Sequence, residues 1–142
     1  GFRTYVILYA LSKNIFTLKN EFQGMLSLPE GATLHKITSL LPPRSTVVEI
    51  GCYKGLSTSF ILSGLRSNSK LYSIDPFDKD LNKQLEEIKK YKDRNYKRTE
   101  YELMKIKSKK IFVEKELKKR GFTRFLLIED YSFNIAKKWN KK

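Results

Sequence analysis

The chain has 142 residues, which fits one domain, and its 40% hydrophobic content indicates a folded globule. The single cysteine excludes an internal disulfide, the single histidine argues against a zinc site, and both counts suit a reducing cytoplasm. The net charge of +14 would attract anionic partners, although the lysines are mixed with glutamates as on solvated helical faces. No apolar run approaches the roughly 18 residues that span a bilayer, so we expect a cytoplasmic protein without a membrane partner.

The first part of the chain, residues 1–44, is predicted to be mainly helical. Residues 2–18 are apolar at mixed spacing, and residues 29–41 place several leucines and an isoleucine on one helical face. Two prolines at 42–43 end this second helix, because proline has no amide hydrogen to donate.

A strand–helix–strand unit is predicted at residues 45–77. Residues 46–50 are a β-branched run that is apolar apart from Glu49, which suits a central parallel strand buried on both faces. A helix is expected at 57–65, and residues 71–75 form the second strand. Two such strands joined by a helix within about thirty residues require a parallel, right-handed crossover.

Residues 78–120 form a long charged stretch without glycine or proline, in which helix-favouring residues dominate. We expect two or three helices there, with a break near 93–99, and Gly121 at the end of the last one. The final part, residues 121–142, supplies a third strand at 122–130 and a further helix. The sequence thus predicts one α/β domain, residues 1–142, with a charged helical insertion.

The turn after the first strand has the composition of a ligand site. Gly51 and Gly55 let the backbone approach a ligand, and the next helix begins with Ser57 and Thr58, whose hydroxyls can cap the helix or donate to a carboxylate. Asp75 ends the second strand, where an acid can accept both hydroxyls of a ribose. The combination indicates an adenosine-type ligand at the carboxyl end of a parallel sheet.

Two phosphate-binding alternatives fit the turn less well. A P-loop requires Gly-Lys-Ser/Thr, but here Lys54 precedes Gly55 and Leu56 follows it. A dinucleotide-binding turn needs bare backbone at its middle glycine, where this chain has Tyr53. A ligand without phosphates, such as S-adenosylmethionine, is therefore favoured.

The stretches "VVEIGCYKGLSTSFIL" and "LYSIDPF" resemble the first two motifs of class I S-adenosylmethionine-dependent methyltransferases. They are most similar to the branch with the pattern E-I-G-x-x-x-G-x-S-T, as are "EFQGMLSLPEGATLHKITSLLP" upstream and "GFTRFLLIEDYSFNIAKKW" downstream. The resemblance covers about residues 21–77 and 121–139. It implies a Rossmann-like three-layer sandwich with a mostly parallel sheet and the first strand at its centre.

The resemblance also implies roles for individual residues. Seven residues would contact or shape the methionine end of the cofactor: Glu49, Gly51, Cys52, Tyr53, Gly55, Ser57 and Thr58. Asp75 would bind the ribose, with Pro76 and Phe77 beside it. The turn after the third strand would line the adenine pocket through Glu129, Asp130 and Ser132, with Tyr131 in a place where the family has a small or acidic residue. Helix capping by the two acids, and a plain buried role for Cys52, remain open alternatives.

The family's fourth strand, which ends in an acidic motif, is expected after Trp139, where the chain stops. We therefore expect the chain to be the cofactor-binding part of the enzyme, incomplete at its C-terminus and inactive alone. No metal ligands are expected within it, and those of any divalent metal would lie beyond residue 142. No catalytic residue can be named.

The function that the resemblance implies is transfer of a methyl group to a small-molecule acceptor, such as a sugar or another hydroxyl compound. Two alternatives remain open. The charged helices would suit an RNA methyltransferase or an RNA-binding module, although no aromatic-basic motif for single strands is present. The chain would otherwise be a non-catalytic helical interaction module on a degenerate scaffold.

Overall fold

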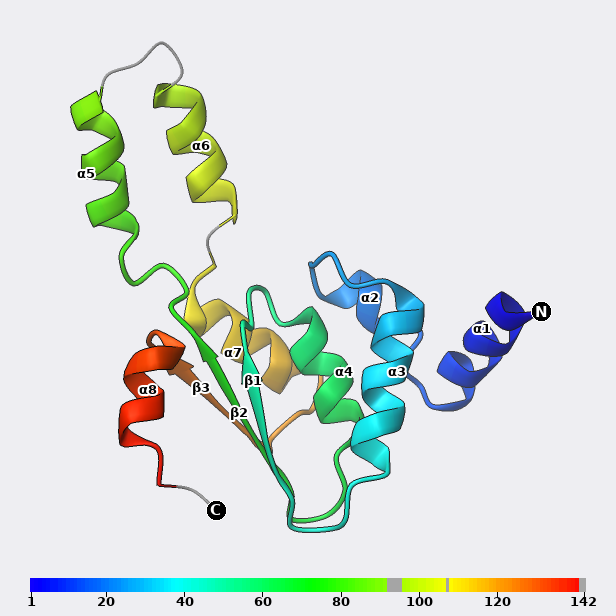
Figure 1. Cartoon of the computed structure of the whole chain (residues 1–142). Helices are drawn as coiled ribbons and strands as arrows, with labels where there is room; N and C mark the ends of the chain where they lie inside the picture. The colour runs from blue at the N-terminus through cyan, green and yellow to red at the C-terminus, as the bar shows by residue number, and fades with distance from the viewer. Residues whose placement is uncertain (92–95, 107, 141–142) are drawn as a thin grey trace.

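The computed structural model describes residues 1–91, 96–106 and 108–140. Its centre is a parallel sheet of β1 (Thr46–Ile50), β2 (Lys70–Asp75) and β3 (Phe125–Glu129) (Figure 1). Leu71 and Leu127 belong to the buried core on one face of this sheet, together with side chains of α4 (Leu56–Gly64) and α7 (Lys110–Lys119). On the other face, Tyr72 packs edge-on against Trp139 at the end of α8 (Ser132–Lys138). The expected three-layer α/β architecture is confirmed.

The sheet differs from the expectation in one respect. Its order is β1-β2-β3, so β2 is the middle strand, and β1 pairs only with β2 within the described residues. Val48 and Ile50 share one face of β1, and this face is exposed, since the two side chains are 45% and 71% exposed. The prediction of a central first strand buried on both faces is therefore wrong for this chain, because no described strand covers the other edge of β1.

The N-terminal part contains three helices: α1 (Phe2–Ser12), α2 (Leu18–Glu21) and α3 (Leu28–Ser39). The single helix expected over 2–18 is divided, because Asn14 has a left-handed backbone with φ of +56°. Helix α3 begins with a capping box, in which Ser27 and Glu30 bond to each other's backbone amides.

Helices α3 and α4 approach each other closely at two glycines. A Cβ on Gly31 would lie 2.4 Å from the buried Phe60 ring, and one on Gly64 would lie 2.4 Å from the carbonyl oxygen of His35. Glycine is therefore required here for close packing rather than for an unusual backbone angle. This contact fixes α4, and with it the turn that precedes α4.

The charged stretch forms α5 (Leu81–Tyr91), α6 (Tyr96–Ile106) and α7. Helices α5 and α6 form a hairpin that projects away from the sheet, whereas α7 packs on β3 through Val113 and Leu117 (Figure 1). Residues 93–95 of the expected break lie outside the described part, and residues 96–99 belong to α6, so there the prediction of a break is wrong. Gly121, with φ of +100°, ends α7 as predicted.

Candidate functional site

The turn between β1 and α4 contains three left-handed residues in five positions. Gly51, Tyr53 and Gly55 have φ values of +92°, +51° and +91°. A Cβ on Gly51 would meet no atom within 4 Å, so this side of the turn is open to a ligand. A Cβ on Gly55 would lie 3.0 Å from Val113, so Gly55 is also needed for packing. Tyr53 adopts a backbone conformation that costs a side-chain-bearing residue free energy, which is a common property of functional turns.

Glu49 is a buried carboxylate, 8% exposed, at the carboxyl end of β1. Its oxygens accept hydrogen bonds from Ser57 Oγ at 2.5 Å, Thr58 Oγ1 at 2.6 Å and Ser73 Oγ at 2.6 Å. Each hydroxyl has one proton, so Ser57 and Thr58 use theirs to hold Glu49. Ser73 was missed in the sequence, although a serine within an apolar strand that pairs with Glu49 is a usable signal.

Asp75 connects the glycine turn to the end of β2. Its Oδ2 accepts the Tyr53 amide at 2.8 Å, and its Oδ1 accepts the Phe77 amide at 2.6 Å. Each carboxylate oxygen can accept two hydrogen bonds, so two acceptor positions remain for a ligand. Asp75 is half-buried and follows directly from the strand, with Pro76 next to it. This arrangement fits the paired hydroxyls of a ribose beside the open face of Gly51.

Cys52 lies inside the turn as a buried thiol. Thr58 donates its proton to Glu49, so the thiol donates to Thr58 Oγ1 at 3.1 Å. Burial raises the pKa of Cys52 to about 12, and the nearby Glu49 carboxylate adds to the shift. A thiol in this state is a poor nucleophile, which favours a shaping role for Cys52.

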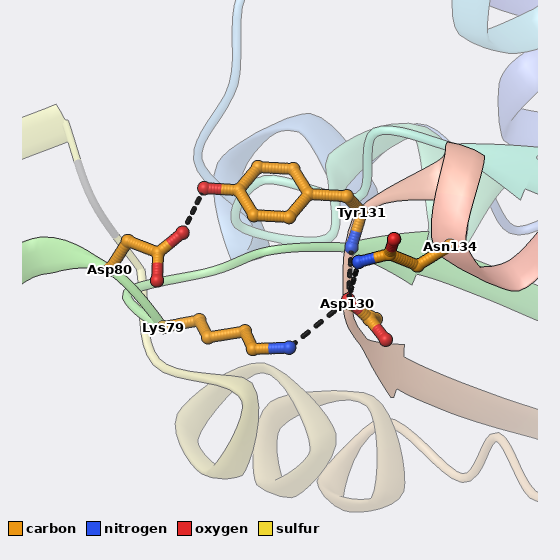
Figure 2. A network of polar contacts seen from close by, with 5 residues as sticks. All are labelled: Lys79, Asp80, Asp130, Tyr131 and Asn134. Carbon is orange, nitrogen blue, oxygen red and sulfur yellow. Dashed lines mark hydrogen bonds and ion pairs between the residues drawn. The ribbon is translucent and has the colours of Figure 1, made fainter.

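A polar network joins the turn after β3 to the segment after β2 (Figure 2). Asp130 Oδ1 accepts from the Tyr131 amide at 2.8 Å, Asn134 Nδ2 at 3.0 Å and Lys79 Nζ at 3.0 Å. These bonds, that from Asn134 foremost, lower the pKa of Asp130 to about 2. The Tyr131 hydroxyl donates to Asp80. The network therefore anchors the base of the α5–α6 hairpin beside the carboxyl end of the sheet.

The other residues of this turn lie around the network. Glu129 is exposed and pairs in register with Asp75, so the two acids end neighbouring strands. Ser132 is the first residue of α8. Tyr131 is the N-cap residue of this helix, and its side chain makes no capping hydrogen bond. Asp130, one residue before this N-cap, accepts a hydrogen bond from the Tyr131 amide. It therefore supports the start of α8 in a way close to the capping role left open above.

The other end of the hairpin contacts the glycine turn itself. Ser108 Oγ donates to the carbonyl oxygen of Tyr53 at 2.6 Å, and Lys54 Nζ donates to Gln23 Oε1 at 3.0 Å and the Lys105 carbonyl at 3.4 Å. A cavity of about 450 Å³ lies between these groups and the apolar side chains Phe22, Phe112 and Val113. Sequence patterns gave no signal for these contacts, which join residues more than thirty positions apart.

Within residues 1–91, 96–106 and 108–140, no group of three or more His, Cys, Asp or Glu side chains could hold a metal ion. His35 is buried, with Nδ1 2.8 Å from Ser63 Oγ. Burial, followed by the charges of Lys13 and Lys36, lowers the pKa of His35. This histidine is therefore a neutral core residue of α3.

The chain is similar to known proteins in sequence and in fold. Residues 48–137 match the model of a family described as "Methyltransferase domain". The fold is similar to the crystal structure of a protein from Corynebacterium glutamicum, with a TM-score of 0.52 and 14% sequence identity. That similarity covers 98% of this chain and 55% of the other, so the chain spans about half the length of that protein. No curated protein sequence matches the chain.

Proposed function

The chain belongs to the family of methyltransferase domains, which use S-adenosylmethionine as methyl donor, and we propose that it forms the cofactor-binding part of a small-molecule methyltransferase. The observation that supports this most is the bond from the Tyr53 amide to Asp75, which joins the glycine turn to the strand-end acid. This bond holds the turn and the acid next to each other, as a shared cofactor site would require.

The bound cofactor would supply an electrophilic methyl group for in-line displacement by an acceptor atom. The residues of this chain would bind and orient the donor. Asp75 would accept the ribose hydroxyls through its two remaining acceptor positions, and the open backbone at Gly51 would lie along the methionine end. Glu49, held by three hydroxyls, would keep β1 and the start of α4 in place.

The proposed acceptor is a hydroxyl group of a sugar or a similar small molecule. This part of the proposal rests on the family resemblance of the E-I-G-x-x-x-G-x-S-T turn. Because the chain spans 55% of the similar structure, the activity is proposed for the protein as a whole.

Calorimetric titration with S-adenosylmethionine tests the donor site. We expect the wild-type protein to bind and Asp75→Ala to bind about thirtyfold more weakly, because hydrogen bonds to a charged group contribute about 2 kcal/mol. Asp78→Ala removes a neighbouring half-buried acid from the same segment and should retain the affinity. Thermal melts of both variants show whether weaker binding reflects unfolding.

Two outcomes would contradict the proposal. No heat from the folded wild-type protein would favour the non-catalytic interaction module. Equal affinity in the wild-type and Asp75→Ala proteins would leave the family assignment intact but remove the ribose role from Asp75.

A further inference from the structure

Helix α1 is apolar around most of its circumference, but only one side of it is covered. Val6 and Ala10 are buried, whereas four large side chains spread over the rest of the helix surface, Phe2, Tyr5, Leu8 and Leu11, are between 56% and 74% exposed. A helix that is apolar on all sides is normally buried, so this surface lacks a partner in the described structure. Together with the exposed Ile37 of α3 and Leu40, the C-cap residue of α3, these side chains form the α1 patch: Phe2, Tyr5, Leu8, Leu11, Ile37 and Leu40.

Part of the patch lies on both sides of a cavity between the two helices. A cavity of about 170 Å³ lies between α1 and α3, and its walls include Phe2 and Tyr5 on one side and Ala32 and Ile37 on the other. Figure 1 shows α1 at the end of the molecule, away from the sheet and from the candidate cofactor site. The patch is therefore a protruding apolar surface with a groove beside it.

The N-terminal segment that carries the patch, residues 1–41, has more cations than acids. Residues 1–20 contain no acid and three cations, Arg3, Lys13 and Lys19. Lys36 of α3 adds a fourth, with its Nζ 5.8 Å from the centre of the Tyr9 ring. The acid in α3, Glu30, stays ionised in the capping box, so it reduces the positive charge of these segments without cancelling it.

This combination distinguishes between possible partners. A second copy of the chain would bring two positively charged segments together across a twofold axis, which is unfavourable. An anionic lipid surface offers negative head groups to these cations and an apolar layer to the leucines and aromatic rings. The net charge of +14 adds a long-range attraction to such a surface.

We propose that the α1 patch docks the protein on the surface of an anionic membrane. Such a contact needs no membrane-crossing segment, and no helix of the described residues is long and apolar enough to be one. A chain without a membrane-spanning segment, as expected from the sequence, can still bind the surface of a membrane. The proposal is independent of the methyltransferase activity.

Co-sedimentation of the full chain with lipid vesicles tests the proposal. We expect binding to vesicles that contain phosphatidylserine, weakening as salt is added, and little binding to phosphatidylcholine alone. Leu8→Glu should weaken binding by at least about tenfold, because it removes an apolar contact that the membrane would bury and adds a charge that the anionic surface repels. The control is Ile111→Glu on α7, which makes the same charge change at a similarly exposed position, 68% against 61% for Leu8.

Three results would overturn the proposal. One is the absence of binding to anionic vesicles by the folded wild-type protein. Another is equal binding by Leu8→Glu and Ile111→Glu, which would indicate a general attraction of the charged surface. The third is a dimer in light scattering that Leu8→Glu dissociates, because the patch would then bind a second copy. Circular dichroism melts confirm that both variants are folded.

Discussion

The substitution Gly64→Ala should destabilise the protein, although alanine is the better helix former. A Cβ at this position would lie 2.1 Å from Thr38 Oγ1 and 2.4 Å from the His35 carbonyl oxygen. The carbonyl belongs to the backbone of α3, so the overlap can be relieved only if the two helices separate. Overpacking of this kind costs up to about 3 kcal/mol, and the helix propensity of alanine offsets about 1 kcal/mol. The free energy of unfolding should therefore fall by about 2 kcal/mol.

Urea unfolding and thermal melts measure this loss, with an expected decrease in Tm of about 6 °C. The matched control is Gly1→Ala, where a Cβ meets no atom within 4 Å, and its stability should change by less than about 0.5 kcal/mol. Adding Thr38→Ala to Gly64→Ala removes the hydroxyl overlap but not the backbone overlap, so it should not restore wild-type stability. A Gly64→Ala protein as stable as the wild type would refute the close approach of α3 and α4.

Three further predictions concern single residues. Cys52 should resist alkylation at pH 8 in the folded protein and react after unfolding, because its thiol is buried and its pKa is raised to about 12; rapid native labelling, followed by mass spectrometry, would contradict this. Asp130 stabilises the fold above about pH 4, and this contribution is lost as the pH falls toward its folded pKa of about 2. Asp130→Asn lacks this carboxylate, so its free energy of unfolding, measured by urea titration at each pH, should fall less over that range than that of the wild type. Parallel pH profiles for the two proteins would contradict this prediction. Gly121→Ala should lower the free energy of unfolding by about 1 kcal/mol, because the φ of Gly121 is +100°, and Gly121→Asn should lower it less. Equal losses for the two variants in thermal melts would contradict a backbone origin of the effect.

The central part of the fold could be predicted because its signals are local. The β-branched run at Thr46–Ile50, the spacing of Gly51 and Gly55, and the strand that ends at Asp75 specify a βαβ unit within one continuous segment. Both glycines have left-handed φ, a conformation that glycine adopts without the strain of a side chain. The position of β1 in the sheet could not be predicted in this way, because strand order depends on pairing between distant segments.

The hydrogen bonds that stabilise the candidate site also divide into local ones, which the sequence indicates, and long-range ones, which it does not. Glu49, Ser57 and Thr58 lie within ten positions, and their association in a motif was visible in the sequence. The bonds from Lys79 to Asp130 and from Ser108 to Tyr53 each join residues more than fifty positions apart. Both depend on where the α5–α6 hairpin leaves and rejoins the domain, which no local pattern specifies.

The placement of this hairpin has a consequence for how the chain folds. Strands β1 and β2 are joined by one short helix, whereas β2 and β3 can pair only after a much longer segment has been enclosed between them. Closure entropy grows with the logarithm of loop length, so a loop of about 50 residues instead of about 20 costs the sheet only about 0.8 kcal/mol. The βαβ unit is therefore expected to form early in folding, and β3 to join it late. A longer hairpin at this place would slow that last step with little loss in the final stability of the sheet.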